Sequence, residues 1–490
     1  MLCSERNKYI RQVMVANRNT FIKRILGFSL ASWVNCILSI ISTPITTALF
    51  APTELGKINM FISYANILIP FIYFGFDQAY VRFYNEPPKD NDKNSLFRIS
   101  FSITSILAVF VSVVVLCFWR YFSNAIAGEY SFIIAVFLAV YLFATLCFRM
   151  SNLKSRMDNA VKRFVLQSIT STFIVKIGFV AVVLVKPDAI YAIGLRSVLL
   201  FIAGMSFIIQ ALRATRSQIV SYNKETVSEL SKFAVPISPT IFLVMLNLSL
   251  SQIMLRRYVD FATVGIFSNA VTIAGIITII QSGLNTFWTP FVYEYYKERK
   301  KIQKMHHAIT FLMVAFAFII ILGQDLIYYV LVDSDYWESK TVLALLLISP
   351  VCDVVSETLG LGIELSKKTY LKLPVYLVNI AVNLGSCLLL IPKYGIIGAA
   401  GANALASISM LLVKTVIGER FYRCSDNYSR LIISVILLIG AGVLGFAMRE
   451  WINVYSLLSL LFVTLLYWKE ARMITTGGLD FVNIKLKKKS

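Results

Sequence analysis

Two basic residues lie inside long apolar stretches, where an ionised side chain needs a partner. Lys176 lies near the middle of one stretch, and Arg196 lies about two turns from the outer end of the next. Placing such a charge in lipid costs roughly 3 kcal/mol, so each needs a counter-charge or a water-filled cavity. Together, an ammonium and a guanidinium would bind a diphosphate or an acidic sugar. The alternative is structural, with Arg196 reaching outward and Lys176 neutralising a carboxylate in the other half of the protein.

Two acidic residues, Asp353 and Glu357, occupy a later apolar stretch. Their i,i+4 spacing places both on one face of a helix. Two adjacent carboxylates suit the uptake and release of a proton, or the coordination of sodium, and so are candidates for ion coupling. The alternative is an ion pair with Lys176 or another cation. Lys414, near the cytoplasmic end of its own stretch, is expected to extend to the membrane surface.

Asp77 and Arg82 stand where the second apolar stretch gives way to a polar loop. They are candidates for a gate that breaks during a conformational change. Five residues separate them, which is not a helical contact spacing, so the alternative is that they position the helix end.

The remaining reactive side chains indicate neither catalysis nor a metal site. His306 and His307 are adjacent in a basic segment, which predicts a solvated loop. The seven cysteines are dispersed and show no metal-ligand spacing. We therefore expect no catalytic residue, no metal and no cofactor, and the chain contains no phosphate-binding GxxxxGK[ST] motif.

The composition identifies the environment of these residues. In 490 residues, 58% are hydrophobic and 15% charged, more apolar content than one water-facing core can bury. The runs are uniformly apolar rather than alternating, which predicts an all-α polytopic membrane protein. The 47 Lys and Arg against 26 Asp and Glu indicate orientation and contact with anionic lipids rather than nucleic-acid binding.

The apolar segments predict about fourteen membrane-spanning helices. Most Lys and Arg residues then fall on one side, so both termini are expected in the cytoplasm of a plasma or inner membrane. A weak repeat relates Gly56 to Gly265, Lys176 to Asn383 and Gly178 to Gly385 at nearly constant separations. It predicts two six-helix lobes in pseudo-repeat around a central cavity, followed by two C-terminal helices.

The predicted boundaries follow from these segments. They are a cytoplasmic segment (1–24), an N-lobe (25–212), a cytoplasmic linker (213–232), a C-lobe (233–418), the last two helices with their preceding loop (419–468), and a basic cytoplasmic tail (469–490).

Four short motifs resemble those of the polysaccharide flippases of the MOP superfamily, the Wzx-type exporters of O-antigen and capsule repeat units. They lie at residues 50–56, 75–84, 233–236 and 391–400. The resemblance spans essentially the whole chain. It implies two bundles that expose a cavity alternately to each side of the membrane, with cationic residues meeting the diphosphate of an undecaprenyl-linked oligosaccharide.

The expected function is therefore translocation of a lipid-linked oligosaccharide for surface polysaccharide biosynthesis, without enzymatic activity. Expected partners are this lipid-linked oligosaccharide and membrane lipids, with a polysaccharide polymerase and a chain-length regulator as candidates. The alternatives are a lipid II flippase, a multidrug or ion antiporter of the same superfamily, and a membrane-embedded polysaccharide polymerase. The short outer loops disfavour the polymerase, because such enzymes usually need a large outer loop or a soluble catalytic domain.

Overall fold

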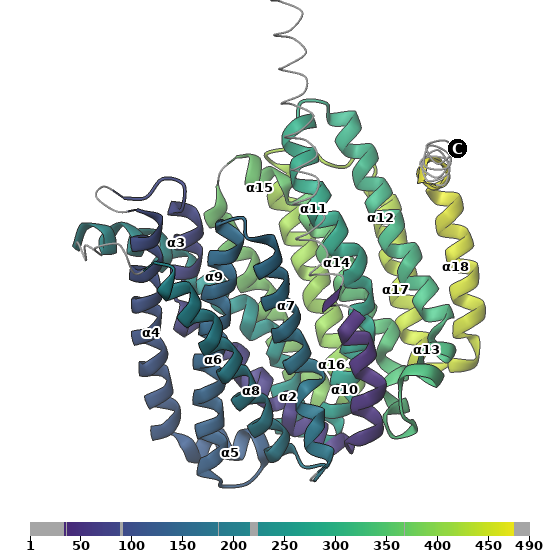
Figure 1. The fold of residues 1–490 in the computed structure, drawn as a ribbon. Helices are drawn as coiled ribbons and strands as arrows, with labels where there is room; N and C mark the ends of the chain where they lie inside the picture. The colour runs from purple at the N-terminus through teal and green to yellow at the C-terminus, as the bar shows by residue number, and fades with distance from the viewer. Residues whose placement is uncertain are drawn as a thin grey trace, which may run out of the picture. The chain divides into compact units, whose positions relative to one another are not determined.

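The computed structural model describes residues 34–35, 37–88, 92–184, 186–215, 224–366 and 368–474. Within these ranges every regular element is a helix (Figure 1). An apolar segment removed from water must satisfy its backbone hydrogen bonds internally, and an α-helix does so within a single segment. The predicted all-α class is confirmed.

By contact, the chain forms two compact units, which are described separately. Unit 1 comprises Met1–Ser42 and Leu68–Ser238, and unit 2 comprises Thr43–Ile67 and Pro239–Ser490. Two helices, α2 (Pro52–Tyr73) and α9 (Lys224–Tyr258), each contribute residues to both units. Residues 43–67 thus group with the later half of the chain, whereas the predicted N-lobe contains them.

In unit 1, α6 is central and packs against α4, α7 and α8. Small residues allow this packing: a Cβ built on Gly204 of α8 would lie 3.0 Å from the carbonyl oxygen of Ala144 in α6. Between α2 and α9, the helices of unit 1 are α3 (Phe76–Phe83), α4 (Lys93–Cys117), α5 (Trp119–Ala127), α6 (Phe132–Met157), α7 (Val161–Lys176), the 3₁₀ helix η1 (Gly178–Leu184) and α8 (Ala189–Arg213).

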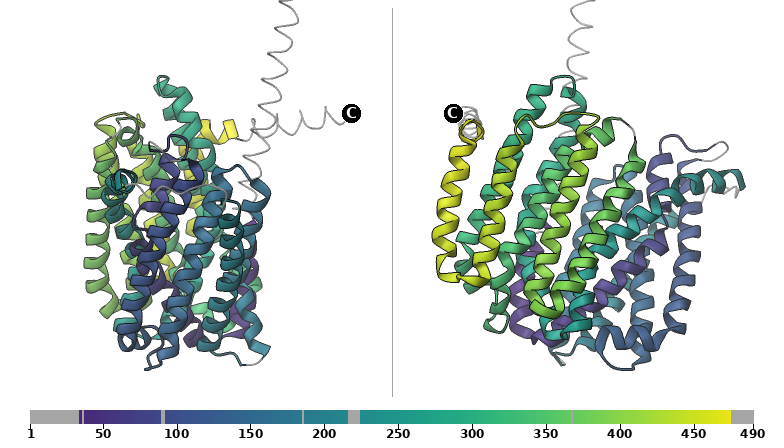
Figure 2. Two further views of the ribbon diagram at one scale, coloured as in Figure 1. Left: turned by 60° about the vertical axis from the view of Figure 1, so that its left-hand side comes forward. Right: turned by 180° about the vertical axis from the view of Figure 1, so that it is seen from behind.

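In unit 2, α14 is central and packs against α10, α12, α16 and α17, while α18 packs against α12. The last two helices, yellow in Figure 2, run side by side in opposite directions. The helices after α9 are α10 (Phe261–Ala274), η2 (Gly275–Ile277), α11 (Thr278–Tyr295), α12 (Arg299–Leu322), α13 (Gln324–Leu331), η3 (Ser334–Val342), α14 (Leu343–Leu359), α15 (Leu361–Leu365), η4 (Thr369–Leu371), α16 (Lys372–Glu419), α17 (Tyr428–Ala447), η5 (Arg449–Trp451) and α18 (Ile452–Leu466).

Eleven helices of the described chain are long and apolar enough to cross a membrane, and Ile37–Leu49 and Phe261–Ile277 are shorter apolar helices. The helix α16 is one of the eleven, although it holds two predicted spans that meet at Gly395, whose φ of 52° bends the backbone. Other predicted spans are divided between helices, as where α7 ends at Lys176 and η1 continues from Gly178 to Leu184. Residues 25–33 of the first predicted span lie outside the described residues.

The first turns of α2 and α10 meet backbone to backbone within unit 2. A Cβ built on Gly56 would lie 2.7 Å from the carbonyl carbon of Phe261 and 3.2 Å from the nitrogen of Gly265. The relation is reciprocal, since a Cβ on Gly265 would lie 3.0 Å from the carbonyl carbon of Pro52 and 3.1 Å from the nitrogen of Gly56. Only glycine allows so close an approach. The two glycines that the sequence repeat pairs thus contact each other.

Candidate functional site

Unit 1 contains a cavity of about 350 Å³ that presents basic and hydroxyl groups. Its cations are Lys176 of α7 and Arg149 of α6. The rest of the lining is Asn35, Tyr73, Tyr141, Thr145, Phe148, Asn152, Ser168, Ser171, Thr172, Val175 and Leu200. Most of these polar groups can donate hydrogen bonds, so the cavity suits an anionic ligand.

Lys176 stands at a break in its predicted span. The helix α7 ends at Lys176, and the chain continues as η1, with the Ile177 N–H donating to the Phe173 carbonyl at 2.8 Å. The C-terminal end of a helix carries partial negative charge and favours a cation. In the described part of unit 1, the ion pairs involve Arg82, Arg149, Lys154 and Lys186. Among the described residues of this unit, no carboxylate forms an ion pair with Lys176.

Arg149 was not among the predicted site residues. It pairs with Asp77 at 2.9 Å, and Gln78 donates to the same carboxylate oxygen at 2.9 Å. The predicted span ends at Phe148, but α6 continues to Met157 and so carries Arg149 on helix. Only an indirect indication of Arg149 was present in the sequence. Asp77, at a helix end, is 3% exposed, and a buried carboxylate needs a cation as a partner.

The structure does not bring Asp77 and Arg82 together. Arg82 instead pairs with Glu86 at 3.4 Å, and both side chains are exposed. The two residues are not paired with each other in this structure, and the gate stays a prediction. Asp77 holds the start of α3 against α6, which agrees with the alternative that it positions a helix end.

Arg196 lies outside the set of residues that line the cavity. Its guanidinium carbon is 4.0 Å from the centre of the Phe179 ring, a cation–π contact. The residue is 3% exposed, and its Nε and Nη1 atoms have no hydrogen-bond partner. The alternative in which Arg196 reaches outward is therefore wrong, and its predicted binding role with Lys176 stays a prediction.

Unit 2 contains a second cavity, of about 340 Å³ and different chemistry. Asp353 of α14 lines it, and no lysine or arginine does so among the described residues. The other lining residues are Asn247, Leu248, Gln252, Phe267, Val271, Ala274, Gly275, Thr278, Gln281, Leu346, Ser349, Pro350, Asn403 and Ser407. The two cavities thus differ in charge, the first basic and the second acidic.

Glu357 points to an ion pair rather than to this cavity. Lys414 donates to the Glu357 carboxylate at 2.5 Å, which agrees with the ion-pair alternative for this residue. The expectation that Lys414 extends to the membrane surface is wrong, because it is only 5% exposed. A Cβ on Gly360 would lie 2.6 Å from the Lys414 Cε, so the absence of a side chain at Gly360 makes room for Lys414. Asp353 remains the carboxylate available for ion coupling.

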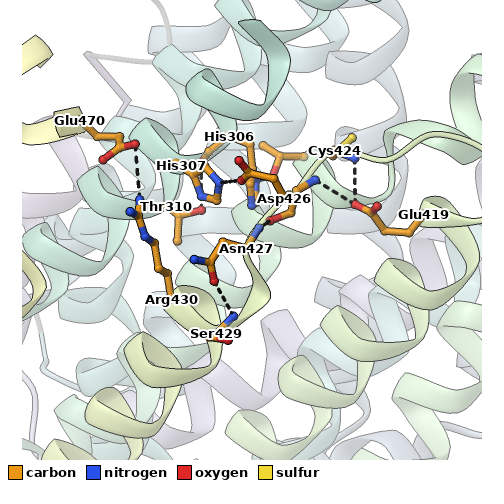
Figure 3. Close-up of polar contacts among 12 residues, drawn as sticks. His306, His307, Thr310, Glu419, Cys424, Asp426, Asn427, Ser429, Arg430 and Glu470 are labelled. Atoms are coloured by element: carbon orange, nitrogen blue, oxygen red, sulfur yellow. Dashed lines mark hydrogen bonds and ion pairs between the residues drawn. The ribbon is translucent and has the colours of Figure 1, made fainter. Parts of the chain in front are cut away.

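His306 and His307 lie within α12, and the prediction of a solvated loop is wrong (Figure 3). The helix begins at Arg299, so its basic first turns are helical and both histidines are buried. His306 Nδ1 lies 2.8 Å from the Thr358 hydroxyl, and His307 Nε2 lies 2.5 Å from Asp426. The hydrogen bond with His307 lowers the pKa of Asp426. This cluster joins α12 to α14 and to the loop before α17, and none of its members lines a cavity described above.

Comparison with solved structures defines the class of protein. The lipid II flippase MurJ in an inward closed conformation matches with a TM-score of 0.64 and 16% identity, over 92% of this chain and 99% of that chain. The MATE multidrug transporter DinF-BH in complex with R6G matches with a TM-score of 0.57 and 14% identity, over 81% and 94%. An inward-facing MATE family transporter of the MOP superfamily gives 0.56 and 14%, over 79% and 94%. The fold is that of MOP-superfamily membrane transporters.

The family follows from the sequence comparison. The family model described as polysaccharide biosynthesis protein matches residues 21–290. This is more than half of the chain, and the chain belongs to that family, as its motifs predicted. No curated protein sequence matches the chain significantly. The protein is thus a polytopic membrane protein of a polysaccharide biosynthesis family with a transporter fold.

Proposed function

We propose that the protein is a flippase that moves an undecaprenyl-diphosphate-linked oligosaccharide repeat unit across the bacterial cytoplasmic membrane for O-antigen, capsule or exopolysaccharide biosynthesis. The observation that carries the proposal is the basic cavity of unit 1, in which Lys176 forms no ion pair with a carboxylate among the described residues of that unit. An uncompensated ammonium inside an apolar protein is unfavourable unless an anion or water occupies the space beside it. A diphosphate supplies such an anion.

The polar lining supports the same ligand. Ser168 and Thr172 present hydroxyls on the α7 wall that also carries Lys176, whereas the Ser171 hydroxyl donates to the Ser168 carbonyl at 3.0 Å. Phosphate oxygens accept hydrogen bonds from hydroxyls and from ammonium groups, and charge assistance strengthens the latter. Arg149 is partly neutralised by Asp77, so we assign it to shaping the cavity and Lys176 to binding the charge.

The transport direction and the partners belong to the proposal. The cargo enters from the cytoplasmic leaflet, both termini are cytoplasmic, and transport proceeds by alternating access. A polysaccharide polymerase and a chain-length regulator act on the product. A second candidate is lipid II, favoured by the extent of the match to the lipid II flippase, which covers 92% of this chain.

The test replaces Lys176 in the native host and measures surface polysaccharide. Lys176→Ala should lower it at least tenfold and accumulate lipid-linked repeat units, whereas Lys176→Arg should retain part of the activity because it keeps the charge. The matched control is Lys186→Ala, which removes an exposed lysine of the same unit that pairs with Asp188.

Full surface polysaccharide in a well-inserted Lys176→Ala protein would refute the anion site. The cargo is decided separately by deleting the gene. Loss of surface polysaccharide with normal growth supports the repeat unit, and growth arrest with accumulation of lipid II supports the second candidate.

A further inference from the structure

The unit 2 cavity contains hydrogen-bonding groups without a basic residue. We propose that this cavity is a subsite for one uncharged sugar residue of the cargo, and that it excludes acidic sugars. The inference rests on the proposed function, because it assigns a second part of the same ligand. Its support comes from the amides, the unpaired hydroxyl and the single carboxylate of the lining.

Two of the amides are held in one orientation by neighbours outside the cavity lining. The Asn247 Oδ1 accepts from Asn383 at 2.7 Å, and the Asn403 Oδ1 accepts from Ser251 at 2.7 Å. Each carbonyl oxygen is thereby used, and each Nδ2 group remains as a donor for a ligand. Such preorganised donors lose little entropy on binding.

The cavity also offers acceptors. Asp353 contributes a carboxylate, and the Ser349 hydroxyl is buried without a hydrogen-bond partner. Buried polar groups almost always have a partner, so an unpaired hydroxyl in a cavity wall indicates a ligand or water in that space. A sugar hydroxyl both donates and accepts, and it can therefore satisfy Asn247, Ser349 and Asp353 alike.

The charge of the cavity decides which sugars fit. A carboxylate or phosphate on the sugar would meet Asp353 with no cation among the described lining residues to balance it. Lys414, the basic residue bonded to the neighbouring Glu357, is itself not part of the lining. Like charges close together in a partly buried site repel each other more than they do in water. Hydroxyl and acetamido groups carry no such penalty.

The remaining lining and the size agree with a pyranose ring. Phe267, Val271, Leu346 and Pro350 provide apolar surface for its C–H faces. The volume of about 340 Å³ lies at the lower end of the range for small-molecule sites, which suits one sugar residue rather than a whole repeat unit.

The test uses soluble probes on the full-length protein in lipid nanodiscs, followed by saturation-transfer difference NMR. The probes are N-acetylglucosamine, glucuronate and inorganic pyrophosphate. A polar ligand of about fifteen non-hydrogen atoms is expected to bind with a dissociation constant on the order of millimolar, which this method detects. The proteins are the unmodified chain, Ser349→Leu, Ser349→Ala, Lys176→Ala and the control Ser206→Leu, which makes the same change on an exposed face.

We expect N-acetylglucosamine to bind the unmodified chain. Its affinity should be at least tenfold lower for Ser349→Leu and about threefold lower for Ser349→Ala. Its affinity for Lys176→Ala and Ser206→Leu should be unchanged. Absence of binding to the unmodified chain, or equal binding to both Ser349 variants, would overturn the sugar subsite. If Ser349→Leu does not elute as a single species, Ser349→Ala alone decides, because it removes only an unpaired hydroxyl.

Exclusion of acidic sugars and the anion site are tested by the other probes. Glucuronate should give no signal with Lys176→Ala. A glucuronate signal from that variant that is lost when Ser349→Leu is added would overturn the exclusion of acidic sugars from the unit 2 cavity. Pyrophosphate should bind the unmodified chain and be lost only in Lys176→Ala. If pyrophosphate does not bind the unmodified chain, or still binds Lys176→Ala, the result counts against the proposed function. The sugar subsite would then still stand.

Discussion

The contact between Gly56 and Gly265 gives the sharpest stability prediction. Alanine at position 56 adds a Cβ that meets the backbone of Phe261 and Gly265, with the carbonyl carbon of Phe261 at 2.7 Å. Backbone atoms cannot rotate away as a side chain does, so α2 and α10 must separate. Overpacking of this kind costs about 1–3 kcal/mol, against which the higher helix propensity of alanine returns up to about 1 kcal/mol.

The matched control is Gly385→Ala in α16, where a Cβ meets nothing within 4 Å. That variant should be stabilised by up to about 1 kcal/mol, because only helix propensity changes. The two variants should therefore differ by about 2 kcal/mol. For domains of about 150–250 residues this corresponds to roughly 4–8 °C in melting temperature, and the shift is smaller for a larger unit such as unit 2.

The assay is the melting temperature of detergent-solubilised protein, followed by the size-exclusion peak of the folded species. Gly265→Ala should behave like Gly56→Ala, because the clash is reciprocal. The double variant should lose less than the sum of the two, since a single separation of the helices relieves both clashes. Equal melting temperatures for Gly56→Ala and Gly385→Ala would refute the close approach.

Two further predictions concern unit 2. Glu357→Gln should lower the free energy of unfolding by about 1 kcal/mol more than Lys414→Met does, and the melting temperature should fall accordingly. The reason is that Glu357→Gln leaves a 5%-exposed ammonium without its partner, whereas the glutamate side chain is 42% exposed. Equal melting temperatures for the two variants would contradict this asymmetry. Asp426 has a lowered pKa in the folded protein, so its stabilising effect is present above its unfolded pKa of about 4 and is lost as pH falls through the folded value. Melting temperatures measured from pH 7 to pH 3 should accordingly fall less for Asp426→Asn than for the unmodified chain, and parallel curves would show that the His307 contact does not affect stability.

The helical architecture could be predicted because hydropathy and length act locally. The described chain contains eleven helices that are long and apolar enough to cross a membrane, and each overlaps an apolar segment of the sequence. Lys176 lines a cavity, as its position inside an apolar run suggested. These features depend on one segment at a time.

Pairings between segments could not be predicted. Arg149 was missed because the hydropathy of α6 falls before the helix ends, and its partner Asp77 comes from α3. The histidines were wrongly predicted to lie in a solvated loop, because the basic first turns of a helix resemble a loop in sequence. In the structure His306 contacts Thr358 and His307 contacts Asp426. The motif at 50–56 carried a family resemblance, but only the structure shows that the backbones of Phe261 and Gly265 leave no room for a side chain at Gly56.

That last contact also affects how the chain is made. Gly56 packs against residues that are synthesised about 200 residues later, which at about 5–20 residues per second means a delay of roughly 10–40 s. During that interval the first turn of α2 lacks its partner, and its small surface must remain unoccupied in the membrane. The order of synthesis therefore makes α2 one of the first helices to be made, whereas this contact forms only after α10 has been made.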